Sequence, residues 1–195
     1  MIDLIKYKKD ALDNYIPLLS DECEEVLIDL LKNKDIKKVL EIGTCIGYSS
    51  LIMLLNSNCT VDTIEIDERR QEKAKALWED YNVLDRVNSY LGDANQILDE
   101  VIKDKIYDFV FLDGPKSWYL RQFNTVFNNL KSGGIILADD VLFFGLVEGP
   151  ERVPHKHRTI VRHLREFLSE LRKNDKINLK LINKGNGIAI IEKKW

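Results

Sequence analysis

The chain has 195 residues, of which 45% are hydrophobic and 31% are charged. This balance provides enough apolar surface for a core, and it excludes a disordered or collagen-like chain. The longest apolar runs, such as 51–55 and 134–138, are far shorter than the roughly 20 residues of a membrane-spanning helix. No secretory signal is visible, and the net charge of −3 excludes a uniformly basic nucleic-acid coat. The three widely spaced cysteines favour a reducing, cytoplasmic location.

Hydrophobic periodicity predicts helices that alternate with short strands. The predicted helices cover 3–15, 21–33, 49–55, 68–81, 95–103 and 118–130, and Ser20 is the expected N-cap of the second one. The predicted strands cover 38–42, 61–66, 86–91, 107–112 and 135–139, the last one after a turn at Gly133 and Gly134. Strands joined by such helices form a mainly parallel α/β sheet with helices on both faces.

The C-terminal part has a different pattern. One apolar face runs along a helix between Ile160 and Leu171. After it, 177–182 and 188–191 flank the sequence Lys184-Gly-Asn-Gly187, a strong signal for an antiparallel hairpin. We therefore predict one domain over 1–195, with N-terminal helices (1–35), a cofactor-binding core (36–140), and a substrate loop, helix and hairpin (141–195).

The loop after the first predicted strand suits a small zwitterionic ligand. In open parallel sheets, ligands bind at the carboxyl ends of the strands. Gly43 and Gly47 let the backbone approach a ligand, and the following helix N-terminus offers N–H groups to an anion. Glu41, at the strand end, suits an ammonium group, so the loop matches the end of an amino acid. The glycine patterns of dinucleotide-binding loops and P-loops are absent.

The next two strand ends continue this pattern. Glu65 suits a ribose hydroxyl, and Leu91-Gly92-Asp93-Ala94 suits an adenine edge. Amino acid, ribose and base together describe S-adenosylmethionine. Each element alone also has a structural explanation, since Gly43 can serve a tight turn and Glu65 can be a solvated charge.

These motifs resemble class I S-adenosylmethionine-dependent O-methyltransferases of the catechol and caffeoyl-CoA type. The likeness covers nearly the whole chain from about Ile16 and is greatest to bacterial tRNA 5-hydroxyuridine methyltransferases. It rests on Glu41-Ile-Gly-Thr-x-Ile-Gly-Tyr-Ser49 and on 16–18, 141–147, 158–161, 164–167 and 185–190. It implies a Rossmann-like fold with a seven-stranded, mostly parallel sheet, and a homodimer. It also implies cofactor contacts by Leu18, Glu41, Gly43, Gly47, Tyr48, Ser49, Glu65, Gly92, Asp93, Ala94 and Asp113.

Three carboxylates follow the fourth and fifth predicted strands and are expected at the same sheet edge: Asp113, Asp139 and Asp140. Such a cluster needs a cation or retained protons, and oxygen ligands suit Mg²⁺. A bound cation would lower the pKa of a substrate hydroxyl, and Lys116 would accept its proton if the pKa of the lysine is depressed. The resemblance assigns the metal to the three aspartates and catalysis to Lys116 and Asp113, although the family usually has Asp-Asn where this chain has Asp139-Asp140.

Simpler interpretations of the same residues stay open. Consecutive strand residues point to opposite faces, so Asp140 joins Asp139 only if the chain leaves the strand there. Asp140 would otherwise cap the following segment, and Lys116 would be a solvated surface lysine. Trp118 and Tyr119 either stack on a planar substrate or pack in the core.

Three histidines, His155, His157 and His163, fall within nine residues of a basic segment. They are interpreted as metal ligands, as a solvated helix entry, or as part of a phosphate-facing basic patch. The preceding stretch 143–154 is expected to be a mobile, substrate-contacting loop. The basic residues of the patch are Arg152, Lys156, Arg158, Arg162 and Arg165.

These observations predict Mg²⁺-assisted methyl transfer from S-adenosylmethionine to a hydroxyl. The resemblance implies 5-hydroxyuridine at the tRNA wobble position as acceptor and 5-methoxyuridine as product. A small catechol or phenylpropanoid is the alternative acceptor, because it also offers a hydroxyl beside a second oxygen. An alternative of another class is a non-catalytic module that binds S-adenosylmethionine or RNA.

Overall fold

The computed structural model describes residues 3–149 and 152–195. Its strands form a seven-stranded sheet in the order β3-β2-β1-β4-β5-β7-β6. Contacts within the chain define two compact units, residues 1–94 and 95–195, and each is described by itself. The strand order and the antiparallel C-terminal pair confirm the predicted sheet.

The first unit combines three parallel strands with four helices, and all elements lie within two residues of the predicted ranges. Ser20 accepts a hydrogen bond from the N–H of Cys23 at 3.2 Å, which confirms the predicted N-cap. The strands are β1 (Lys38–Ile42), β2 (Thr60–Glu65) and β3 (Val87–Leu91), with β2 between the other two. The helices are α1 (Leu4–Asp13), α2 (Asp21–Asn33), α3 (Tyr48–Asn56) and α4 (Glu68–Asp80).

An arginine joins the end of α3 to the start of β3. Helices end in carbonyl groups that lack an intrahelical partner. The Arg86 guanidinium donates to the carbonyl oxygens of Leu54 at 2.5 Å and Ser57 at 3.0 Å. A cation at this end also complements the helix dipole, so the contact fixes where α3 ends relative to the sheet strands of its unit.

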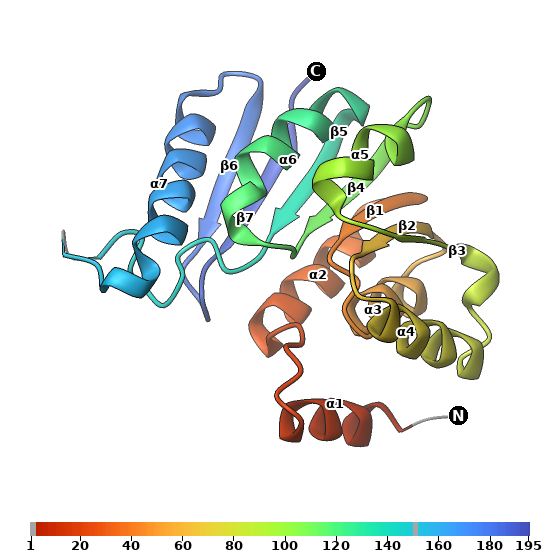
Figure 1. The fold of residues 1–195 in the computed structure, drawn as a ribbon. Coiled ribbons are helices and arrows are strands. Elements are labelled where there is room, and N and C mark those ends of the chain that lie inside the picture. Colours follow the sequence, from red (N-terminus) through yellow and green to blue (C-terminus); the bar gives the residue numbers. More distant parts are fainter. Residues whose placement is uncertain (1–2, 150–151) are drawn as a thin grey trace. The chain divides into compact units, whose positions relative to one another are not determined.

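The second unit begins as α5 (Ala94–Ile102) leads into β4 (Tyr107–Leu112). Strand β5 (Leu130–Ala138) pairs in parallel with β4, and β7 (Ile188–Lys193) runs antiparallel to both β5 and β6 (Ile177–Ile182). Helices α6 (Tyr119–Val126) and α7 (Arg158–Lys173) lie on the same face of these strands (Figure 1). The Phe167 ring of α7 packs against the Tyr119 and Phe123 rings of α6. The distances between ring centroids are 5.6 Å and 6.2 Å, respectively.

The structure corrects the prediction around β5. Helix α6 ends at Val126 and a 3-10 turn follows, because β5 already begins at Leu130. Gly133 and Gly134 therefore lie inside the strand and not in a turn before it. The register shifts between Tyr107 and Phe109 of β4, and Gly133 has φ +71°. The glycines thus permit a bulge in which β5 has more residues than its partner strand.

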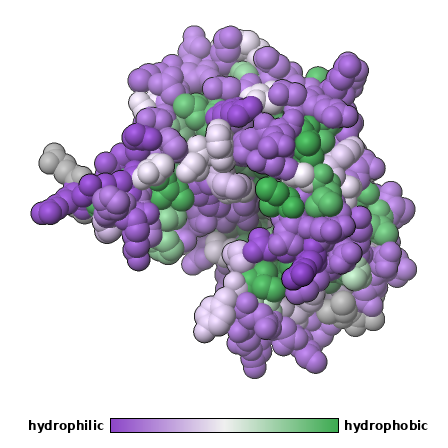
Figure 2. Space-filling view, viewed as in Figure 1, coloured by the Kyte–Doolittle hydropathy of each residue, from purple (hydrophilic) through white to green (hydrophobic). Residues whose placement is uncertain are grey.

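None of the helices in the described ranges combines the length and apolar character needed to cross a bilayer. On the face shown in Figure 2, most of the surface is hydrophilic and the hydrophobic residues form separate small patches. Scattered apolar residues of this kind are normal on a folded chain.

Candidate active site

The carboxylate of Glu41 is fully buried at the end of β1. The hydroxyls of Ser49 and Thr63 donate to it at 2.6 Å each, and the hydroxyl of Ser50 donates as well. Thr63 is the register partner of Glu41 on β2, and both serines lie in the first turn of α3. A buried charge is stable only with such partners, so Glu41 holds the loop together from within. Its predicted contact with a ligand ammonium stays a prediction.

Glu65, at the end of β2, is held by backbone groups instead. Its carboxylate accepts the N–H groups of Cys45 at 2.7 Å, Ile66 at 3.0 Å and Asp67 at 2.9 Å. The bond from Cys45 joins the end of β2 to the loop after β1. A carboxylate has about four acceptor sites, so the arrangement is compatible with the predicted ribose hydroxyl.

Glycine is required at the start of α3 for two reasons. Gly47 has φ +81°, a conformation that other residues adopt at a cost. A Cβ atom there would lie 2.7 Å from the Cβ of Ala74, and the Trp78 indole donates to the Gly47 carbonyl at 3.0 Å. No side chain in the described part of the chain caps α3. Its first N–H groups therefore suit the carboxylate end of the predicted cofactor.

Most of the other predicted cofactor residues of the first unit lie next to these loops in sequence, whereas Leu18 precedes α2. The Tyr48 hydroxyl donates to Glu24 at 3.0 Å, and burial with the nearby Glu24 charge raises the pKa of Tyr48 to about 12. The Gly92 N–H donates to the Glu65 carbonyl at 2.8 Å. Leu18, Asp93 and Ala94 are half-buried. The first unit thus carries three predicted contact segments at the ends of β1, β2 and β3.

In the second unit, an ion-paired cluster lies at the ends of β4 and β5. The Lys116 ammonium lies 2.7 Å from Asp113 and 3.3 Å from Asp140. Strand β5 ends at Ala138, and Asp140 has φ +58°. The chain therefore leaves the strand at Asp140, which is the condition under which both consecutive aspartates reach one site. Asp139 accepts the N–H of Asp140 at 2.8 Å.

Charge and burial determine where protons reside in this cluster. Burial, together with the charges of Asp113 and Asp140, raises the pKa of Asp139 to about 7. Burial also raises the pKa of Asp113, against the opposing effect of Lys116. Burial alone would lower the pKa of Lys116, but the neighbouring Tyr119, Asp113 and Asp140 outweigh it and hold this pKa well above the usual value. Without a metal ion, the ion pairs thus keep the proton on the lysine, and a depressed pKa of Lys116 near a bound metal stays a prediction.

The chemistry of this cluster fits a divalent cation. All three acids offer oxygen ligands, the kind that Mg²⁺ prefers, and the Lys116 ammonium already occupies a cation position between Asp113 and Asp140. Within residues 3–149 and 152–195, no three His, Cys, Asp or Glu side chains are arranged as metal ligands. Metal binding by the aspartates therefore requires Lys116 to shift, and it stays a prediction. The three histidines His155, His157 and His163 likewise do not form such a group of metal ligands with other described residues.

The two aromatic residues after Lys116 have different environments. Tyr119 is fully buried, and its hydroxyl lies 2.8 Å from the Leu112 carbonyl and 3.0 Å from the Asp139 carbonyl. It therefore packs in the core and fixes the ends of β4 and β5. Trp118 is 42% exposed, and the Arg121 guanidinium lies 5.6 Å from its ring centroid. The sequence left this choice open, and only the packing of α6 decides it.

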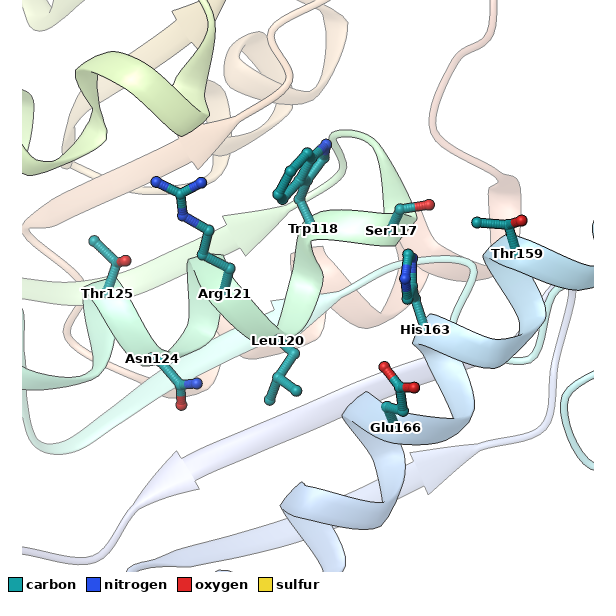
Figure 3. Close-up of a pocket in the computed structure, with 9 residues that line it drawn as sticks. All are labelled: Ser117, Trp118, Leu120, Arg121, Asn124, Thr125, Thr159, His163 and Glu166. Atoms are coloured by element: carbon teal, nitrogen blue, oxygen red, sulfur yellow. The ribbon is translucent and has the colours of Figure 1, made fainter.

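A groove of about 780 Å³ lies between α6 and α7 (Figure 3). It begins directly after Lys116, because Ser117 and Trp118 form one end of it. On the opposite side, Thr159, His163 and Glu166 project from α7 toward α6. Sequence reasoning did not find this groove, because it depends on how the two helices pack.

The segment after Asp140 is tied to α7 over its described part. Arg165 donates to the carbonyl oxygens of Val147 at 2.9 Å and Leu146 at 3.1 Å. Arg172 forms an ion pair with Glu148. Of the predicted mobile loop 143–154, residues 150–151 lie outside the described residues, and the motion itself stays a prediction.

Comparisons with known proteins agree on one family. A family model described as O-methyltransferase matches residues 6–194. The chain is 31% identical to a caffeoyl-CoA O-methyltransferase of Medicago sativa, over 83% of this chain and 68% of that protein. It is 29% identical to caffeoyl-CoA O-methyltransferase 1 of Arabidopsis thaliana, of which it spans 65%.

Solved structures show the same likeness. A Staphylococcus aureus protein assigned to the caffeoyl-CoA O-methyltransferases is 27% identical, with a TM-score of 0.90 over 99% of this chain and 93% of that one. The methyltransferase PaMTH1 of Podospora anserina, solved with S-adenosylhomocysteine, is 25% identical. Its TM-score is 0.81 over 91% of this chain and 80% of that one.

Replacement of Gly47 by alanine is expected to lower the free energy of unfolding by about 2–4 kcal/mol, because positive φ and overpacking against Ala74 both oppose a Cβ atom. Gly133→Ala is the matched control, since Gly133 has φ +71° but no neighbour within 4 Å of the added atom. For Gly133→Ala we expect the free energy of unfolding to fall by about 1–2 kcal/mol. Urea unfolding measures both changes, and equal losses would show that the contact with α4 is unimportant.

Proposed function

The chain belongs to the O-methyltransferase family and is an S-adenosylmethionine-dependent enzyme of that class, and from this premise we propose that it methylates an acidic hydroxyl with the help of Mg²⁺. The observation that carries the proposal is the pairing of Lys116 with two carboxylates at the strand ends of the second unit. A lysine and several acids in one partly buried cluster are typical of a site that binds a cation and handles a proton.

We propose that the loops of the first unit hold the methyl donor. The uncapped start of α3 faces the donor's carboxylate, and Glu65 accepts from a ribose hydroxyl while three N–H groups keep it in place. Glu41 supports these contacts indirectly, since its hydroxyl partners fix the turn after β1. S-adenosylmethionine supplies an already activated methyl group, so these residues chiefly orient the reacting carbon.

We propose that the cluster of the second unit prepares the acceptor. Asp113, Asp139 and Asp140 would hold the divalent cation, which lowers the pKa of an acceptor hydroxyl when bound. The charges of the acids keep Lys116 protonated, so it can accept the hydroxyl proton only after the acids are neutralised and its ammonium has released its own proton to solvent. Tyr119 holds the backbone of this site by its contacts with Leu112 and Asp139.

For the acceptor we propose 5-hydroxyuridine at the tRNA wobble position. Its hydroxyl lies beside a carbonyl oxygen, so both oxygens can bind one cation. The net charge of −3 does not by itself attract a phosphate backbone. The exposed cations Arg152, Lys156 and Arg162, in and before α7, supply that attraction locally. A catechol or phenylpropanoid is the second candidate, favoured by the caffeoyl-CoA names of the relatives.

Incubation with labelled S-adenosylmethionine and Mg²⁺, in parallel with undermodified tRNA, 5-hydroxyuridine and catechol, tests the acceptor. We expect label in tRNA, and nuclease digestion followed by mass spectrometry should locate it in 5-methoxyuridine. Label in catechol alone would exclude the RNA acceptor. No label in any hydroxyl compound would favour a non-catalytic module that binds S-adenosylmethionine or RNA.

Lys116→Arg is expected to lower kcat roughly 10²–10⁴-fold, the usual contribution of a general base. Arginine keeps the ion pairs with Asp113 and Asp140 but does not give up its proton, so folding is preserved. Binding of S-adenosylhomocysteine, measured by calorimetry, should remain as in the unmodified protein. Lys103→Met removes an exposed lysine outside the cluster and should leave kcat unchanged. A fully active Lys116→Arg protein would exclude a base at this position.

Chelation with EDTA is expected to abolish turnover, and added Mg²⁺ should restore it. Asp140→Asn removes one charge from the cluster while keeping an oxygen ligand, so it should raise the Mg²⁺ concentration needed for half-maximal rate. Asp85→Asn, an exposed acid in the first unit, serves as the control. Full activity in EDTA would contradict the proposed role of a metal ion, but it would not contradict the proposal that the protein transfers a methyl group.

A further inference from the structure

We propose that a pocket beside the first turns of α7 binds a backbone phosphate of the RNA acceptor, an inference that rests on the acceptor proposed above. The pocket measures about 390 Å³ and lies entirely within the second unit. Among the residues that the structure describes, its charged lining is strongly unbalanced, with four guanidinium groups against the carboxylate of Glu166. The arginines are Arg152, Arg158, Arg162 and Arg165.

The spacing of the arginines brings them to one place. Arg158, Arg162 and Arg165 follow one another at intervals of four and three residues, so they share a face of α7. Arg152 reaches the same pocket from the segment before the helix. A guanidinium fork matches two oxygens of a phosphate, whereas a lysine offers a single point charge.

Part of this arrangement is fixed in place by backbone contacts. The Arg158 side chain donates to the Val153 carbonyl at 3.3 Å, and Arg165 donates to the carbonyl oxygens of residues 146 and 147. Arg162 lies 4.0 Å from Glu166, at the limit of an ion pair. Because each guanidinium has five N–H donors, the contacts of Arg158 and Arg162 orient these two groups and leave further donors for a ligand.

The charges at the start of α7 are opposite to those that favour a helix. Helix starts favour acids and disfavour cations. This chain follows that rule in α2, whose first turn holds Asp21, Glu22 and Glu24. Helix α7 has no acid in its first turn, begins with Arg158, and has no side-chain cap within the described residues. An anion bound here would compensate the arginine charges, whereas the Arg158 N–H already donates to the His155 carbonyl of the 3-10 helix that precedes α7.

The pocket adjoins the groove between α6 and α7. Glu166 borders both the arginine pocket and the groove between α6 and α7. The other end of that groove is formed by Ser117 and Trp118, directly after Lys116. A phosphate held by the arginines would therefore fix a nucleotide chain whose neighbouring parts extend along the groove (Figure 3).

Equilibrium binding of a fluorescent anticodon stem-loop, measured over a series of KCl concentrations, tests the pocket. The double variant Arg158→Gln/Arg162→Gln should bind the stem-loop roughly tenfold more weakly. The slope of the logarithm of the association constant against the logarithm of the KCl concentration should become less steep by about the amount that one phosphate contact contributes. Arg162→Lys should bind with intermediate affinity. The matched control is Lys173→Gln/Lys176→Gln, which removes two exposed charges at and just after the C-terminal end of the same helix and should bind like the unmodified protein.

Three outcomes would overturn the inference. Unchanged RNA binding by the pocket variant would exclude the site, even if tRNA is the methylated acceptor. An equal loss in the control variant would show a general charge effect. If the unmodified protein binds no RNA but methylates catechol, the acceptor proposal fails together with the pocket. Thermal unfolding of all variants confirms that they are folded.

Discussion

Like charges held at the ends of two neighbouring strands are the constraint on which the chemistry of the second unit depends. Parallel pairing of β4 and β5 places Asp113 beside Asp139 and Asp140, and burial makes this negative charge unfavourable. Lys116 neutralises part of it, and the Tyr119 hydroxyl keeps the backbone from relaxing apart. Protons, a lysine or a metal ion can each compensate the acids, so the charge state of this site is exchangeable.

The first unit handles buried acids in the opposite way. Glu41 and Glu65 are surrounded by neutral donors, hydroxyls in one case and backbone N–H groups in the other. Such donors do not compete with one another for protons, and they fix the side chains at one position. A rigid loop can orient a ligand. A cluster whose charge can change is suited to a different task, the removal of a proton from a ligand.

Much of this arrangement follows from local patterns. The strand ranges were predictable because buried strands and charged helices differ in period, and the positions of Glu65 and Asp113 at strand ends follow from the ranges alone. The partners of Glu41 were not predictable, since Thr63 becomes its neighbour only through the pairing of β1 with β2. The bulge at Gly133 and the burial of Tyr119 likewise depend on tertiary packing, which periodicity does not report.

The left-handed backbone at Asp140 restricts which amino acids evolution can place there. Bulky residues are uncommon near φ +58°, although Tyr15 and Phe144 of this chain adopt φ 56°, and glycine carries no ligand atom. Aspartate and asparagine are the two residues that combine tolerance of this conformation with a side-chain oxygen. Exchange between these two residues would keep the backbone conformation and the side-chain oxygen while changing the charge of the site.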